Sequence, residues 1–153
     1  MRSIATALLL LASGCACVGS AGAQEAPRRL PSPAEAGLYF HTPLNNMSVP
    51  PKFKVRIGLR GMGVAPAGVQ KAGTGHHHLL IDTQLARFDQ PIPNNPQHVH
   101  LGNGQTEVEV TLPPGRHTLQ LVLGDHDHIP HDPPVVSQRI QITVRDREIV
   151  EAR

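Results

Sequence analysis

The chain has little cysteine, few aromatic residues and no strong excess of charge of either sign. Of its 153 residues only two are cysteines, Cys15 and Cys17, and both lie near the N-terminus. The rest of the chain therefore has no disulfide, and thiolate metal ligation and cysteine catalysis are excluded there. With no Trp, one Tyr and three Phe, the chain offers few of the aromatic platforms common in sugar-binding modules.

The charge balance limits the possible partners in the same way. The formal net charge is +2 with neutral histidines, and no basic patch carries interleaved aromatic residues. We therefore expect no nucleic-acid partner. Beyond the N-terminus no apolar stretch is long enough to span a bilayer, so we expect no integral membrane segment once a leader is removed.

The N-terminus predicts export. Arg2 precedes a short apolar run over residues 4–12, and Ala21-Gly22-Ala23 forms a small-residue cleavage site. This order indicates a signal peptide over residues 1–23 and a periplasmic or secreted protein. Alternatively, residues 12–15 resemble a lipoprotein signal that would leave a lipid on Cys15. The mass of the mature protein distinguishes the two.

The remaining sequence predicts one small β domain. A Pro/Ala-rich segment at 24–37 is predicted to be a flexible linker, 38–145 a domain, and 146–153 a charged tail. Within the domain, short β-type runs alternate with Gly, Pro and Asn, and no segment has helical periodicity. This pattern favours an all-β, immunoglobulin-like two-sheet sandwich of about seven short strands. The expected strands cover 38–40, 53–59, 76–83, 98–101, 106–112, 117–123 and 135–144. Asn103-Gly104 predicts a hairpin between the fourth and fifth of them.

Histidine is the unusual component, with ten residues, all after the predicted leader. Seven of them fall into three clusters once three are set aside. His41 is interpreted as incidental, and His77 as a core residue bonded to a backbone carbonyl. His117 follows a Pro-Pro-Gly-Arg turn, where it takes the place of the tyrosine that often anchors the corner of a sandwich strand.

The three clusters have the spacing of metal ligands. Alternate side chains of a strand share a face, so His76 and His78 project together, as do His98 and His100. The third cluster lies in a proline-stiffened loop. Neutral imidazole suits zinc, copper and nickel, and without cysteine the set fits zinc or copper(II) best. The predicted ligand pool is His76, His78, His98, His100, His126, His128 and His131. Carboxylates that would ligate the ion or orient the rings are Asp82, Asp125, Asp127 and Asp132. We expect the clusters to converge at one end of the sandwich.

Four ordered segments resemble the bacterial family known as domain of unknown function 4399. They are residues 75–82, 102–107, 112–121 and 124–131, and the resemblance covers residues 38–144. It implies an exported, compact domain and supplies no activity, ligand or catalytic residue.

Three functions are compatible with these residues. The first is a periplasmic metal-binding protein that acts as a zinc or copper carrier, buffer or accessory module. The second is a small zinc-dependent hydrolase with Glu107 or an aspartate as general base, although no HExxH or GxSxG motif is present. The third is an interaction module of the cell envelope without a metal, in which the histidines form a structural hydrogen-bond network or sense pH. No catalytic residue is assigned, and an envelope protein remains a possible partner.

Overall fold

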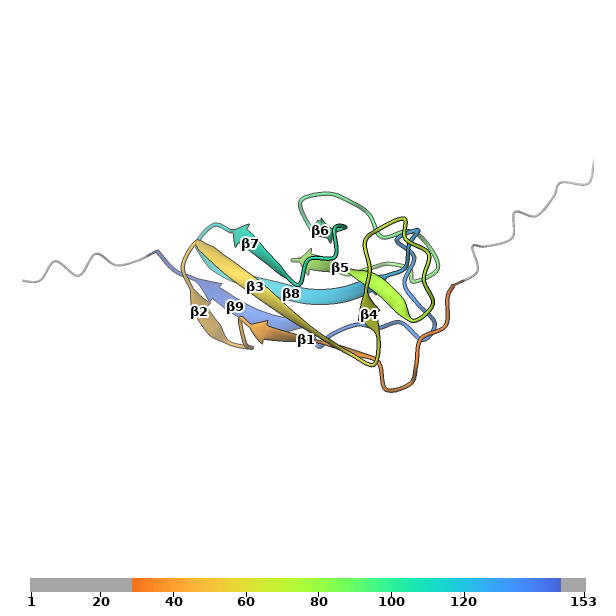
Figure 1. The fold of residues 1–153 in the computed structure, drawn as a ribbon. Coiled ribbons are helices and arrows are strands. Elements are labelled where there is room, and N and C mark those ends of the chain that lie inside the picture. The colour runs from red at the N-terminus through yellow and green to blue at the C-terminus, as the bar shows by residue number, and fades with distance from the viewer. Residues whose placement is uncertain (1–28, 147–153) are drawn as a thin grey trace, which may run out of the picture.

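The computed structural model describes residues 29–146, which form nine strands and no helix. The predicted signal peptide, its Cys15 alternative, residues 24–28 and residues 147–153 lie outside this range. Across 29–146 no helix is long and apolar enough to cross a membrane. The strands form two sheets, which confirms the prediction of an all-β sandwich (Figure 1).

The smaller sheet has the order β1-β3-β7, from β1 (Gly37–Thr42), β3 (Lys52–Arg60) and β7 (Glu107–Thr111). The larger sheet runs β2-β9-β8-β5-β4, with β6 also paired to β5. Its strands are β2 (Met47–Val49), β4 (Gly63–Val64), β5 (Thr74–Ile81), β6 (His98–Leu101), β8 (Gly115–Gly124) and β9 (Ile140–Val144). The short strands β2 and β4 fall outside the predicted strand ranges, because two or three residues carry no readable alternation.

The core lies between the two sheets. From the larger sheet, the odd-numbered side chains of β5 and β8 point into it, and Leu79 and Leu121 are fully buried there. From the smaller sheet, alternate residues of β3 such as Val55 and Ile57 meet them. This is the alternation that the sequence pattern predicted for half-buried strands.

The outer face of β5 is buried as well. Leu80 packs there with Ile92 and Val122 in a second, smaller apolar cluster. Ile92 belongs to the connection 82–97, and its backbone N–H donates to the carbonyl of His128 at 2.9 Å. The connections that follow β5 and β8 thus cover this face (Figure 1). The even-numbered residues of β5, including His76 and His78, therefore lie under loops instead of in solvent.

The predicted hairpin at Asn103-Gly104 is wrong. β6 pairs with β5 in the larger sheet, whereas β7 pairs with β3 in the smaller one. The chain therefore changes sheets at this turn. The partner of β7 is consistent with its charges, because Glu107 and Glu109 bond to lysines and an arginine of β3.

Part of the segment predicted to be a flexible linker is bonded to the domain. Arg29 donates from Nε to the carbonyl of Pro130 at 3.0 Å, and Asp132 donates its backbone N–H to Leu30 at 2.8 Å. Ser32 donates its backbone N–H to the carbonyl of Asp132 at 3.0 Å. Over residues 29–32 the chain therefore lies against the loop that contains His131.

Candidate metal centre

Four histidines from three separate parts of the chain lie together on the outer face of the larger sheet. β5 provides His76 and His78, two residues apart on one face. β6 adds His100, whose Cα is the antiparallel partner of His78. His128 comes from the loop after β8 and has a φ of 67°. We call this set, His76, His78, His100 and His128, the histidine cluster.

The rings of the histidine cluster are in mutual contact. Their centroids are separated by 4.7 to 5.9 Å over the six possible pairs. One nitrogen from each of His76, His100 and His128 lies within 4.8 Å of the other two. His76 and His78 are 0% and 1% exposed, whereas His100 and His128 are partly exposed. The cluster is therefore closed towards the sheet and is reached from the side of the loops.

Two glycines provide the space that the rings occupy. A Cβ atom at Gly102 would lie 2.2 Å from Cε1 of His100. A Cβ at Gly124 would lie 2.8 Å from Cε1 of His78 and 3.3 Å from Cα of His128. Sequence reasoning missed both glycines. Gly102 could have been found from its position two residues after His100, because residues two apart on an extended chain face the same way.

Most nitrogens of the histidine cluster have no hydrogen-bond partner in the described part of the chain. Both nitrogens of His76, both of His78, and Nε2 of His100 are buried and unpaired. Burial, followed by the neighbouring rings, lowers the pKa of His76 to about 4 and that of His78 to about 2. The same causes lower the pKa of His100. These rings are therefore held neutral, the form in which imidazole binds a metal.

The carboxyl group of Asp125 shapes the loop that carries His128. Asp125 is 2% exposed, and its Oδ1 accepts the backbone N–H groups of Asp127 and Ile129, each at 2.9 Å. Its carbonyl also accepts the N–H of His128 at 3.0 Å. Asp125 was predicted to ligate the ion or to orient a ring. The contacts instead show it fixing the backbone on both sides of His128.

Three histidines of the predicted ligand pool lie outside the histidine cluster. His98 bonds through Nδ1 to Oδ1 of Asn95 at 3.0 Å. Nε2 of His126 lies 3.2 Å from Asp127 at the surface. His131 is buried beside Gly75, on the face of β5 opposite to that of His76. The first predicted cluster thus contributes both of its histidines to the site, and each of the other two contributes one.

The other aspartates also act away from the histidine cluster. Asp82 accepts a 2.6 Å hydrogen bond from Nδ1 of His117, and Asp132 pairs with Arg29 at 3.2 Å. Asp127 contacts His126, as described above. Asp82 and Asp132 therefore do not orient a ring of the cluster, contrary to our expectation, because their carboxyl groups are bonded to His117 and Arg29 instead.

The histidines that we set aside as structural have the predicted contacts. Nδ1 of His77 lies 2.9 Å from the carbonyl oxygen of Gln105, and the ring is buried in the core. Nε2 of His117 lies 2.9 Å from the carbonyl oxygen of Pro113. His117 therefore ties the corner as a tyrosine would, which confirms that interpretation. His41 is exposed on β1.

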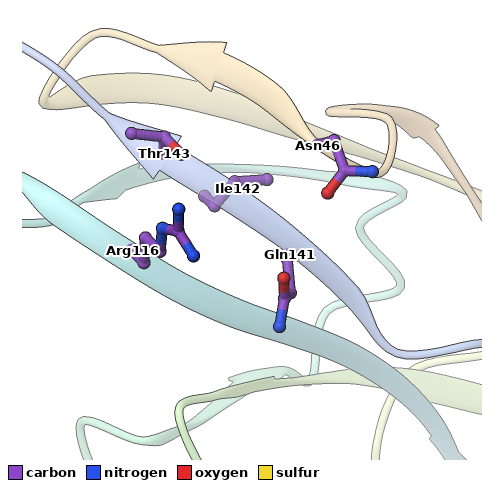
Figure 2. Close-up of a pocket in the computed structure, with 5 residues that line it drawn as sticks. All are labelled: Asn46, Arg116, Gln141, Ile142 and Thr143. Atoms are coloured by element: carbon purple, nitrogen blue, oxygen red, sulfur yellow. The ribbon is translucent and has the colours of Figure 1, made fainter.

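A separate surface pocket offers no comparable chemistry. Figure 2 shows it over β8 and β9, lined by Asn46, Arg116, Gln141, Ile142 and Thr143. Arg116 is the one titratable side chain in this lining, so the pocket contains no acid–base pair. The histidine cluster is the stronger candidate site.

Fold and site together define a small all-β sandwich with a loop-covered group of imidazoles on one sheet. The family whose model matches residues 55–145 is described as Domain of unknown function (DUF4399). The chain belongs to this family, and the matched range includes every residue of the histidine cluster. No curated protein and no solved structure matches the chain.

Proposed function

We propose that this protein is an exported metal-binding protein that holds zinc or copper(II) on the histidine cluster. It would serve the cell envelope as a carrier, buffer or accessory module. The observation that carries the proposal is the convergence of buried, unpaired imidazole nitrogens from β5, β6 and the loop after β8. Export rests on the predicted signal peptide.

Other histidines of the same chain serve as an internal comparison. His77, His98 and His117 each bond to a carbonyl or side-chain oxygen. At least one nitrogen of each of these three rings therefore has an oxygen partner, in keeping with the rule that buried polar groups are bonded. A purely structural network would bond the rings of the histidine cluster in the same way. Their free lone pairs instead favour a cation as the missing partner.

A small zinc hydrolase is the second candidate. Three nitrogens, from His76, His100 and His128, lie within 4.8 Å of one another, and three protein ligands plus water are the pattern of a catalytic zinc. However, Glu107, one of the candidate general bases, is exposed on the smaller sheet and pairs with Lys54 and Arg56. It is not available to a metal-bound water at the histidine cluster.

Metal analysis of the protein without an affinity tag tests the proposal. The protein is purified from the periplasm of an expressing bacterium, and its zinc, copper and nickel contents are measured. We expect about one equivalent of metal and a higher melting temperature when metal is restored after chelation, because binding to the folded state alone stabilises it.

The matched variants are His100→Ala, which should lose the metal, and His41→Ala, which should keep it because its ring is exposed on β1. Absence of stoichiometric metal, together with no thermal shift on adding zinc or copper(II), would exclude the proposal. A partner bound equally well with and without metal would instead favour the envelope interaction module.

A further inference from the structure

The spacing of the four rings carries information about the geometry of the bound ion. The separations are 4.7 Å for His76–His78, 5.0 Å for His76–His100, and 4.9 Å for His76–His128. The remaining pairs are His78–His100 at 5.2 Å, His78–His128 at 5.9 Å and His100–His128 at 4.8 Å. Five of the six separations thus fall between 4.7 and 5.2 Å, and only His78–His128 is longer.

Nearly equal separations describe a tetrahedron. In a square of ligands, the arrangement that copper(II) prefers, the two diagonals are about 1.4 times the sides. Here the longest separation, 5.9 Å, exceeds the shortest, 4.7 Å, by a factor of about 1.3, and the opposite pair, His76–His100, is only 5.0 Å apart. Imidazoles bound tetrahedrally at about 2.0–2.1 Å from zinc place their ring centres about 5 Å apart.

His78 decides whether the ion would have four imidazole ligands or only three. The three nitrogens that already converge belong to the other members of the cluster. The ring of His78 is tilted 26° to that of His100, and both of its nitrogens are buried and unpaired. The ring of His78 packs against Gly124, where a Cβ atom would lie 2.8 Å from Cε1 and 3.2 Å from Nδ1 of the ring. A closed shell requires the His78 ring to rotate about its Cβ–Cγ bond until one of its nitrogens faces the other three.

We infer that His78 completes a closed tetrahedral shell of four imidazoles that takes zinc(II), with no coordination position left for water or substrate. This inference rests on the proposed function and narrows it. Zinc has no geometric preference of its own from d electrons and is almost always four-coordinate and tetrahedral in sites without an open position. A closed shell stores or transfers the ion, and it leaves no site for hydrolysis.

Two measurements on the full-length mature protein test the inference. X-ray absorption at the zinc edge should report four nitrogen ligands, all with imidazole scattering. The cobalt(II)-substituted protein should show the intense visible bands of tetrahedral cobalt. Three imidazoles plus an oxygen, or the weak bands of a five- or six-coordinate cobalt, would overturn the closed shell while leaving metal binding intact.

A pair of variants gives an independent test. His78→Asn should weaken zinc binding by more than about 100-fold, because even residues that only orient a ligand contribute about 10–100-fold. His98→Asn, on the same side of the larger sheet but bonded to Asn95, should bind as the wild type does. Unchanged zinc affinity in a folded His78→Asn protein would contradict the inference. Failure of the wild type to bind any metal would instead refute the proposed function itself.

Discussion

Replacing Gly102 by alanine tests the site with a single methyl group. The new Cβ would lie 2.2 Å from Cε1 and 2.5 Å from Nε2 of His100, where 3.4–4 Å is ordinary contact. The ring would have to move by about 1 Å. Metal–ligand distances tolerate about 0.2 Å, so the displaced nitrogen could not remain a ligand. We expect Gly102→Ala to weaken zinc binding as much as His100→Ala does, by more than about 100-fold, or about 2.8 kcal/mol.

The same substitution should leave the metal-free fold intact. The φ of Gly102 lies outside the left-handed region, and the ring of His100 is partly exposed and can turn outwards. Alanine also restricts the unfolded chain, so the free energy of unfolding should change by less than about 1 kcal/mol. Titration with a competing chelator measures the affinity, and urea unfolding of the metal-free protein measures stability.

The matched control is Gly63→Ala on β4, where the nearest side-chain atom is Cγ2 of Thr74 at 3.3 Å and no histidine ring is displaced. It should bind zinc as the wild type does. Wild-type zinc affinity in Gly102→Ala would show that the metal does not use the His100 ring where the structure places it, and the reasoning would be refuted.

Three further predictions concern the surroundings of the site. Asp125→Ala should weaken zinc binding in chelator titrations and lower the free energy of unfolding in urea by about 1–3 kcal/mol, because the loop of His128 loses its acceptor. Asp125→Asn keeps an acceptor oxygen and should retain most of the zinc affinity and most of the stability. Burial alone would lower the pKa of His117, but its hydrogen bonds to Asp82 and to a backbone carbonyl raise this pKa above 6.5. Burial alone would raise the pKa of Asp82, but its hydrogen bonds from His117 and from a backbone N–H hold this pKa below 3.8. The destabilisation caused by His117→Gln should thus be largest between about pH 4 and 6.5. It should fade at higher pH as His117 deprotonates and at lower pH as Asp82 is protonated. Equal unfolding curves for the variant and the wild type in that pH window would count against the His117–Asp82 pair. Burial and the neighbouring rings lower the pKa of His76 from 6.5 to about 4, so the unfolded chain binds more protons than the folded protein between these pH values. The free energy of unfolding of the metal-free protein should therefore fall by on the order of 3 kcal/mol as the pH falls from 6.5 to 4. A free energy of unfolding that does not change with pH in urea unfolding would show that the cluster is hydrated and open.

The alternation of strand residues was enough to predict half of the site. The positions of His76 and His78 two residues apart on β5 follow from strand geometry alone. The assignment of His77 to the core followed from the same rule. The sequence could not show that the outer face of β5 is covered, because that depends on Ile92, in a loop with no periodic pattern.

The choice among the remaining histidines depends on tertiary structure. His100 faces His78 because of the register between β6 and β5, and no local pattern encodes that register. In the loop after β8, three histidines have similar neighbours in sequence. Only His128 is turned towards the cluster, through a φ of 67° and the backbone contacts of Asp125. Positive φ at a residue other than glycine is uncommon, and it cannot be read from the sequence.

The energetic cost of the unpaired nitrogens is the strongest reason to expect a ligand. Five nitrogens of His76, His78 and His100 are buried without a partner in the described part of the chain. One ion can take one nitrogen from each ring, which is three of the five, and at about 1–3 kcal/mol each these three would cost about 3 kcal/mol or more, a large part of the stability of a domain of this size. A chain that needed only a rigid loop there would fold at lower cost with apolar residues at these positions. Histidines at these positions are therefore better explained by metal binding. The binding energy of the ion offsets their cost, and it stabilises the fold only when the ion is present.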